Sequence, residues 1–220
     1  MPDSPRFVRH GRVDIAVHEL RGGAGRSLVL LHGLGERSPD GVPPWAEAWT
    51  GPIVAVDFCG HGASTIPDGG GYSAEMLLGD VDAVLGDLGD VSIVGRGLGA
   101  YVALLAAGAR AAQVHGTVLA DGPGLAGGGV QPGSPTLVAT STTFAPPDPW
   151  ALVELARDIR PPDYALTYLH FALERSTAPD PVIVSAMLRP EWLAAVVAEP
   201  GVPTASLASA VGLLEGTRTL

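Results

Sequence analysis

The sequence is poor in cysteine, aromatic residues and charge. Cys59 is the one cysteine among 220 residues, which excludes an internal disulfide and favours a reducing, cytoplasmic setting. Aromatic residues make up 5% and charged residues 16%, against 46% hydrophobic residues. This balance is typical of a globular chain with a buried core rather than a disordered one, and the length suits a single domain.

Positive charge and long apolar runs are also scarce. The 13 Lys and Arg residues face 23 Asp and Glu residues, which gives a formal net charge of −10. An acidic chain is a poor partner for nucleic acid or an anionic membrane surface. No uncharged apolar run reaches the roughly 18 residues of a spanning helix, and the polar N-terminal stretch has no signal-peptide core. We expect neither nucleic acid nor membrane as a partner, while the high apolar content is compatible with a homo-oligomer.

Apolar runs alternate with amphipathic stretches along the whole chain. This alternation predicts the α/β class, with a mainly parallel sheet of seven or eight strands and helices on both faces. We expect one domain over residues 1–220, flexible at 1–5 and 215–220. The expected strands are 7–10, 13–20, 27–31, 53–58, 91–94, 114–120, 135–140 and 181–186. The expected helices are 45–49, 73–88, 97–109, 148–158, 163–174, 191–199 and 205–214.

One turn carries the most specific motif. A β-branched run beginning at Val91 leads into Gly95, Arg96, Gly97, Leu98 and Gly99, and an uncharged helical stretch follows. The pattern G-x-S-x-G at such a strand–turn–helix junction exposes a nucleophilic serine above a parallel sheet. Gly97 stands in the serine position here, so the turn has no side chain that could attack a substrate.

Two further turns follow expected strands at matching intervals. The first reads His32-Gly33-Leu34-Gly35, and the second reads Asp57-x-x-Gly60-x-Gly62-x-Ser64. Together with the turn at Gly97, they resemble the α/β-hydrolase fold over about residues 6–121. The resemblance implies a sheet with little or no cap domain and an ancestry among enzymes that process small esters, lactones or thioesters. It also implies an oxyanion hole, with one backbone N–H from the Gly33–Leu34 loop and one from Leu98, and a loop ordered by His32.

The residues for serine hydrolysis are incomplete. That reaction needs a nucleophile, a base and an acid that orients the base. Gly97 removes the nucleophile, and no histidine occurs from Phe171 to Leu220, where the family places its base after the last strand. Asp121 and Asp148 are candidate acids by position. The sequence therefore predicts a degenerate hydrolase that binds a small carbonyl or ester-like ligand without serine-type turnover, in a pocket formed by Gly33, Leu34, Arg96, Gly97, Leu98 and Asp121.

Two other interpretations stay open at this point. An active lyase or hydrolase would use His32, Asp57 or Asp121 as acid or base beside the retained oxyanion donors. A dinucleotide-binding protein would use Gly95-x-Gly97-x-x-Ala100, with Asp121 on a ribose hydroxyl. Cys59 is interpreted as a small apolar core residue. The histidine spacing indicates no metal site, and we expect no cofactor in the leading interpretation.

Overall fold

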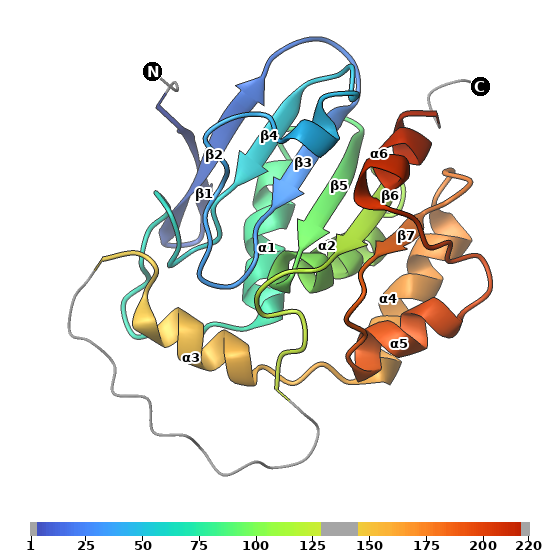
Figure 1. Cartoon of the computed structure of the whole chain (residues 1–220). Coiled ribbons are helices and arrows are strands. Elements are labelled where there is room, and N and C mark those ends of the chain that lie inside the picture. Colours follow the sequence, from blue (N-terminus) through green and yellow to red (C-terminus); the bar gives the residue numbers. More distant parts are fainter. Residues whose placement is uncertain (1–3, 129–144, 217–220) are drawn as a thin grey trace.

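The protein is built around one seven-stranded sheet. The structure is a computed structural model and describes residues 4–128 and 145–216. The strand order is β1-β2-β4-β3-β5-β6-β7, which confirms the expected α/β class (Figure 1). The strands are β1 Arg6–His10, β2 Val13–Arg21, β3 Ser27–Leu31, β4 Ile53–Val56, β5 Val91–Arg96, β6 Val114–Ala120 and β7 Val182–Ser185. The strand expected over 135–140 lies outside the described residues.

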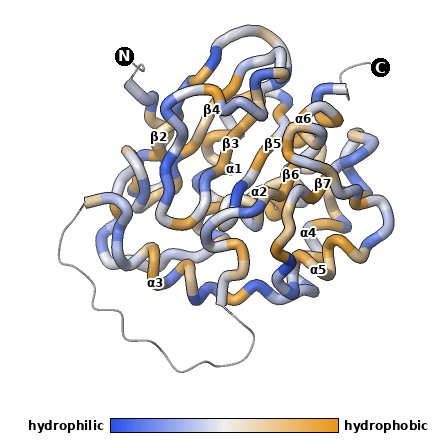
Figure 2. The backbone as a smooth tube through the Cα atoms, viewed as in Figure 1, coloured by the Kyte–Doolittle hydropathy of each residue, from blue (hydrophilic) through white to orange (hydrophobic). Residues whose placement is uncertain are grey.

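Strand direction brings the chemically interesting turns to one edge. β1 and β2 form an antiparallel hairpin, and β2 pairs antiparallel with β4. The strands from β4 to β7 run parallel to one another. Their carboxyl ends therefore share one edge of the sheet, which is where ligands bind in open α/β sheets. β3 and β4 are almost entirely apolar because both faces of the sheet are covered, and Figure 2 shows the central strands as mainly orange segments inside the molecule.

Helices cover both faces of the sheet. The core on one face includes side chains of α1 Ala74–Leu85, α2 Leu98–Ala109, α4 Pro162–Arg175 and α5 Glu191–Ala198. The core on the other face includes side chains of α6 Leu207–Gly216 and the short 3₁₀ turn η1 Pro44–Ala46 (Figure 1). In the described chain, α3 Pro149–Arg157 is the helix between β6 and α4.

Local chemistry explains where the helices begin and why one is uncharged. Ser73 caps α1, because its hydroxyl accepts a hydrogen bond from the N–H of Met76. Every residue of α2 from Leu98 to Gly108 is buried between the sheet and its neighbouring helices, so no face of α2 remains for charge. The element types were predicted correctly, but their ends differ. The helix expected over 45–49 is the 3₁₀ turn, and α6 continues to Gly216 rather than ending at Leu214.

None of the helices in the described part of the chain is long and apolar enough to cross a membrane.

Two helical glycines in different surroundings predict opposite effects of adding a methyl group. A Cβ on Gly108 would lie 2.8 Å from Cα of Tyr168, in the backbone of α4. Gly108→Ala should therefore lower the free energy of unfolding by about 1–3 kcal/mol, because α2 and α4 must separate. Gly212 in α6 has no heavy atom within 4 Å of such a Cβ, so Gly212→Ala should raise that free energy by about 0.5–1 kcal/mol. Urea unfolding of both variants checks this pair, and effects of the same sign would contradict the packing described here.

Candidate functional site

Gly97 forms the sharp bend between β5 and α2. Its backbone angles are φ +58° and ψ −119°, in a region that L side chains rarely adopt. The flanking glycines, Gly95 and Gly99, also have backbone atoms packed directly against them. A Cβ on Gly95 would overlap the carbonyl of Gly99, and one on Gly99 would lie 2.6 Å from the carbonyl oxygen of His32. The bend predicted at residue 97 is therefore present, and each glycine of the motif meets a backbone neighbour.

One backbone carbonyl accepts hydrogen bonds from two turns of this edge. The N–H groups of Leu34 and Leu98 both donate to the carbonyl oxygen of Pro123, at N–O distances of 3.0 Å and 2.9 Å. These are the two donors expected to form an oxyanion hole. A Cβ on Gly97 would lie 2.6 Å from the carbonyl carbon of Gly122 and 2.8 Å from the nitrogen of Pro123. The space over Gly97 therefore holds the chain's own backbone.

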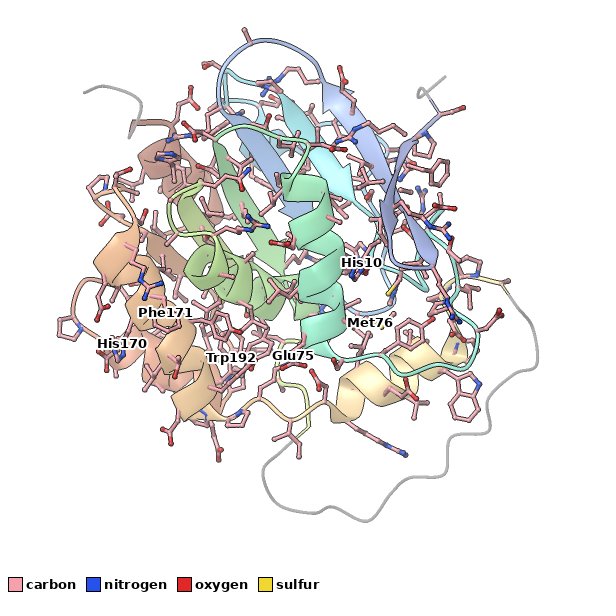
Figure 3. The ribbon with its side chains drawn as sticks, turned by 180° about the vertical axis from the view of Figure 1, so that it is seen from behind. His10, Glu75, Met76, His170, Phe171 and Trp192 are labelled. Atoms are coloured by element: carbon pink, nitrogen blue, oxygen red, sulfur yellow. The ribbon has the colours of Figure 1, made fainter. Side chains whose placement is uncertain are left out.

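Buried side chains hold this segment in place. Arg160 is 3% exposed, and its Nη1 donates to the carbonyls of Gly124 and Leu125. Its guanidinium carbon lies 4.9 Å from the ring centre of Tyr101, a cation–π contact. Nε1 of Trp192, labelled in Figure 3, donates to the same Leu125 carbonyl at 2.8 Å. Burial lowers the pKa of Arg160 to about 10, so the side chain stays charged at neutral pH and binds the two carbonyls strongly.

His32 uses both ring nitrogens to order the turn after β3. Its Nδ1–H donates to the carbonyl of Gly33 at 2.7 Å, and its Nε2 accepts from the N–H of Phe58 at 3.1 Å. His61 is also buried, and its Nε2 accepts from the N–H of Gly35 at 3.2 Å. The two imidazoles therefore join the turn after β3 to the turn after β4, and neither presents a free nitrogen to a substrate.

The candidate acids bind backbone rather than imidazole. The carboxylate of Asp121 accepts from the N–H groups of Met187 and Leu188, at 2.6 Å and 3.1 Å, and so closes the loop that follows β7. Asp148 caps α3 through the N–H of Trp150.

Asp148 also accepts from the hydroxyl of Tyr72 at 2.7 Å. Both aspartates are therefore fixed by structural hydrogen bonds.

Arg96 lies on the wall of a small cavity beside the bend. It forms an ion pair with Glu36, whose second carboxylate oxygen accepts from the N–H of Gly33 at 3.0 Å. The cavity has a volume of about 260 Å³, and His32 and Trp45 also line it. Arg96 and Glu36 thus connect the turn after β5 to the turn after β3.

No base reaches the bend. The structure describes all six histidines, and among the described residues none of them is hydrogen-bonded to Gly97 or Leu98. His170 lies on α4 and pairs with Glu199 at 3.2 Å (Figure 3). The base predicted to be missing after the last strand is therefore not replaced by a histidine from elsewhere.

The dinucleotide interpretation gains no support from this geometry. A pyrophosphate would need free N–H groups at the start of α2. The N–H of Leu98 donates to Pro123 and that of Gly99 donates to the carbonyl of His32 at 3.1 Å. Asp121, the expected ribose acid, already accepts two backbone hydrogen bonds. The described residues also contain no cluster of His, Cys, Asp or Glu that could hold a metal ion.

Sequence reasoning missed two features of this edge. One is the Pro123 carbonyl, for which the sequence signal is weak: a Gly-Pro-Gly run that follows β6 after Asp121. The other is a pair between His18 and Asp57, whose Nε2 and Oδ2 atoms are 2.9 Å apart. His18 lies among apolar residues of β2, where a polar side chain is a mild signal, but its partner 39 positions away follows only from the pairing of β2 with β4.

The comparisons with known proteins decide the family. Residues 28–217 match the family model described as "Alpha/beta hydrolase family". The chain belongs to this family. No curated protein matches the sequence significantly.

Solved structures of α/β hydrolases share the fold at low sequence identity. The haloalkane dehalogenase DatA from Agrobacterium tumefaciens is 19% identical, with a TM-score of 0.60 over 92% of this chain and 87% of that one. Est1E from Butyrivibrio proteoclasticus, solved with ferulic acid, is 12% identical, with a TM-score of 0.60 over 96% of each chain. The N-formylmaleamic acid deformylase Nfo from Pseudomonas putida is 16% identical, with a TM-score of 0.57 over 92% of this chain and 91% of that one. At these identities the likeness extends to the fold and not to the chemistry.

Adding a side chain at Gly97 should lower the free energy of unfolding for two reasons, backbone strain and contact with a neighbouring segment. Gly11 has nearly the same φ as Gly97, +57° against +58°, but no heavy atom lies within 4 Å of a Cβ built on it. Gly11→Ala should lower the free energy of unfolding by about 1–2 kcal/mol through backbone strain. Gly97→Ala should cost about 1–3 kcal/mol more, because Gly122 and Pro123 must also move. Chemical denaturation of both variants measures the difference, and equal losses would mean that the segment does not fill the space over Gly97.

The buried His32 predicts a loss of stability in acid. Burial, followed by repulsion from His61, lowers the pKa of His32 from 6.5 to about 4. The unfolded chain therefore takes up a proton at higher pH than the folded chain does. The contribution of His32 to the free energy of unfolding is fully present above about pH 6.5 and is lost as the pH falls to 4, by up to about 3 kcal/mol at roughly 1.4 kcal/mol per pH unit.

Urea unfolding between pH 7 and pH 4 checks this contribution. The His32→Asn variant should start from a lower stability, because the hydrogen bonds to Gly33 and Phe58 are lost, but its stability should fall less steeply with acid. Parallel pH curves for the two proteins would show that His32 is not the group responsible.

Proposed function

We propose that this α/β hydrolase family member has no serine-type turnover and acts by non-covalent binding of a small carbonyl or ester-like compound at the bend. The observation that carries the proposal is that one carbonyl oxygen, that of Pro123, accepts from both Leu34 and Leu98. The two N–H groups therefore already hold an oxygen of the type that a carbonyl ligand would offer, at ordinary hydrogen-bond distances.

The groups around Gly97 favour ligand binding over covalent catalysis. Covalent catalysis needs a nucleophile and a base within hydrogen-bond reach of it. Gly97 supplies no side chain, and His32 has both nitrogens engaged. The alternative of His/Asp chemistry at the same donors is disfavoured, because both oxygens of Asp121 already accept from backbone N–H groups.

A ligand at this place must displace the segment Gly122–Gly124. Its carbonyl would take over the two N–H groups that Pro123 now occupies, so the number of hydrogen bonds at the turn would be unchanged. The cost would lie in moving a segment that Arg160 and Trp192 hold through Gly124 and Leu125. Binding is therefore expected to be weak, selective for small carbonyl compounds and coupled to this loop. A cytoplasmic setting fits the single buried thiol of Cys59.

Ester hydrolysis by the parent chain and by Gly97→Ser tests the catalytic part. Neither protein should hydrolyse p-nitrophenyl acetate or butyrate with saturation kinetics, because the new hydroxyl has no base and no room. A fluorophosphonate probe should likewise leave Gly97→Ser unlabelled. The control is Gly212→Ala purified in the same way, which reveals contaminating esterase. Saturable turnover by the parent protein, or robust turnover created by the serine alone, would overturn the proposal.

Amide resonances test the binding part. Titration with phenyl acetate should shift the N–H signals of Leu34 and Leu98 together, since both donors exchange the Pro123 oxygen for the ligand oxygen. The N–H of Met76 at the start of α1 is a suitable internal control, because its acceptor is the hydroxyl of Ser73. If the signals of Leu34 and Leu98 stay fixed through saturating ester, the bend is not a carbonyl-binding site.

A further inference from the structure

A histidine and an aspartate meet in a second cavity at the carboxyl edge of the sheet. His18 comes from β2 and Asp57 directly follows β4, and His18 lies opposite Ala55 in the pairing of the two strands. Nε2 of His18 and Oδ2 of Asp57 are 2.9 Å apart. The Asp57 side chain is 2% exposed while that of His18 is 22% exposed. The pair therefore has a buried carboxylate and an accessible imidazole.

Hydrogen bonds fix the charge on Asp57 and so the proton on His18. Burial alone would raise the pKa of Asp57, but the N–H groups of Ala63 and Ser38 donate to its two oxygens at 2.8 Å and 2.7 Å, and the pKa lies below its usual value. An ionised carboxylate can only accept, so Nε2 of His18 carries the proton. In the neutral ring, Nδ1 is then the unprotonated nitrogen, and the described residues offer it no hydrogen-bond partner.

The cavity beside this pair suits a small molecule. Its volume is about 500 Å³, within the range of ligand pockets. His18, Asp57, Glu36 and Arg37 supply its charged and polar lining, and Pro146 and Pro147 supply apolar wall. Gly97 and Leu98 are not among its lining residues in the described chain, so this site is separate from the bend.

The charges of the cavity favour an anion at one position. The negative charge of Asp57 is stabilised by three hydrogen-bond donors, and that of Glu36 is stabilised by its ion pair with Arg96. Arg37 differs, because it is paired with Asp40 through two hydrogen bonds, at 2.7 Å and 2.9 Å, and both side chains are largely exposed. Solvent and salt weaken such an exposed pair, so a ligand carboxylate can compete with Asp40 for the guanidinium.

We propose that this cavity binds a small hydroxy acid, with the ligand hydroxyl donating to Nδ1 of His18 and the ligand carboxylate paired with Arg37. The prolines contact its carbon skeleton. Asp57 accepts from Nε2–H of His18 and so holds the imidazole in the tautomer whose Nδ1 can accept the ligand hydroxyl. The site goes beyond the function proposed for the bend and does not depend on it.

Three probes of similar size separate the two polar contacts. Lactate carries the hydroxyl and the carboxylate, propanoate lacks the hydroxyl, and 2-propanol lacks the carboxylate. Each is titrated into the full chain while the imidazole ¹H and ¹⁵N signals are followed by NMR, with the His18 signals assigned from the His18→Gln variant. Lactate should bind saturably with a Kd of about 1 mM or tighter and shift the His18 signals. Propanoate and 2-propanol should each bind about 10-fold more weakly.

Matched variants identify the residues. His18→Gln and Arg37→Gln should each weaken lactate binding about 10-fold. His170→Gln is the control for the first, because His170 is also paired with a carboxylate but lies on α4, on the far side of α1 from β2 (Figure 3). Arg110→Gln is the control for the second, because Arg110 also forms an exposed pair with an aspartate, Asp82. Both controls should leave the affinity unchanged.

Several results would overturn the proposal. The proposal would be wrong if lactate did not bind saturably, if lactate and propanoate bound equally well, or if His18→Gln or Arg37→Gln left the affinity for lactate unchanged. If His18→Gln does not fold, the comparison of the three probes on the parent chain and the exposed Arg37→Gln variant still decide. Lactate is not an ester, so neither outcome depends on whether the bend binds or hydrolyses carbonyl compounds.

Discussion

A single carbonyl group joins the three parts of the site. The oxygen of Pro123 accepts from Leu34, in the turn after β3, and from Leu98, at the first position of α2. A backbone N–H buried without an acceptor costs free energy comparable to a lost hydrogen bond. In a family member with an open site, water or substrate would meet that requirement. Here the chain meets it internally, and the segment after β6 is ordered by the same two donors.

The segment that carries this carbonyl is held by a buried charged side chain, that of Arg160, and buried charges are uncommon in a protein core. The charge of Arg160 is stabilised by the carbonyls of Gly124 and Leu125, by the face of Tyr101 and by the charge of Asp158. A buried cation is costly to leave without such partners. The arrangement therefore links the segment over Gly97 to the packing of α2 against α4 and α5, where Tyr101 contacts Trp192.

The sequence predicted the fold well because the fold depends on local, periodic signals. The buried runs of β3 and β4, the hydroxyl cap at Ser73 and the glycines of the bend are each legible within a few residues. The sharp bend at Gly97 was recognisable for the same reason. The Pro123 carbonyl was not predictable, since a backbone acceptor has no side chain to mark it. The His18–Asp57 pair was missed because it depends on the register of an antiparallel strand against a parallel sheet.

The path of Gly122 and Pro123 has an evolutionary consequence. A serine codon at position 97 would place its Cβ against this backbone, so the mutation would lose stability before it could gain activity. A histidine after β7 would be neutral at best without that serine. Neither substitution alone would therefore produce hydrolysis: the serine would lower the stability of the fold, and the histidine would have no hydroxyl to deprotonate. The segment therefore opposes any single substitution that adds a side chain at position 97.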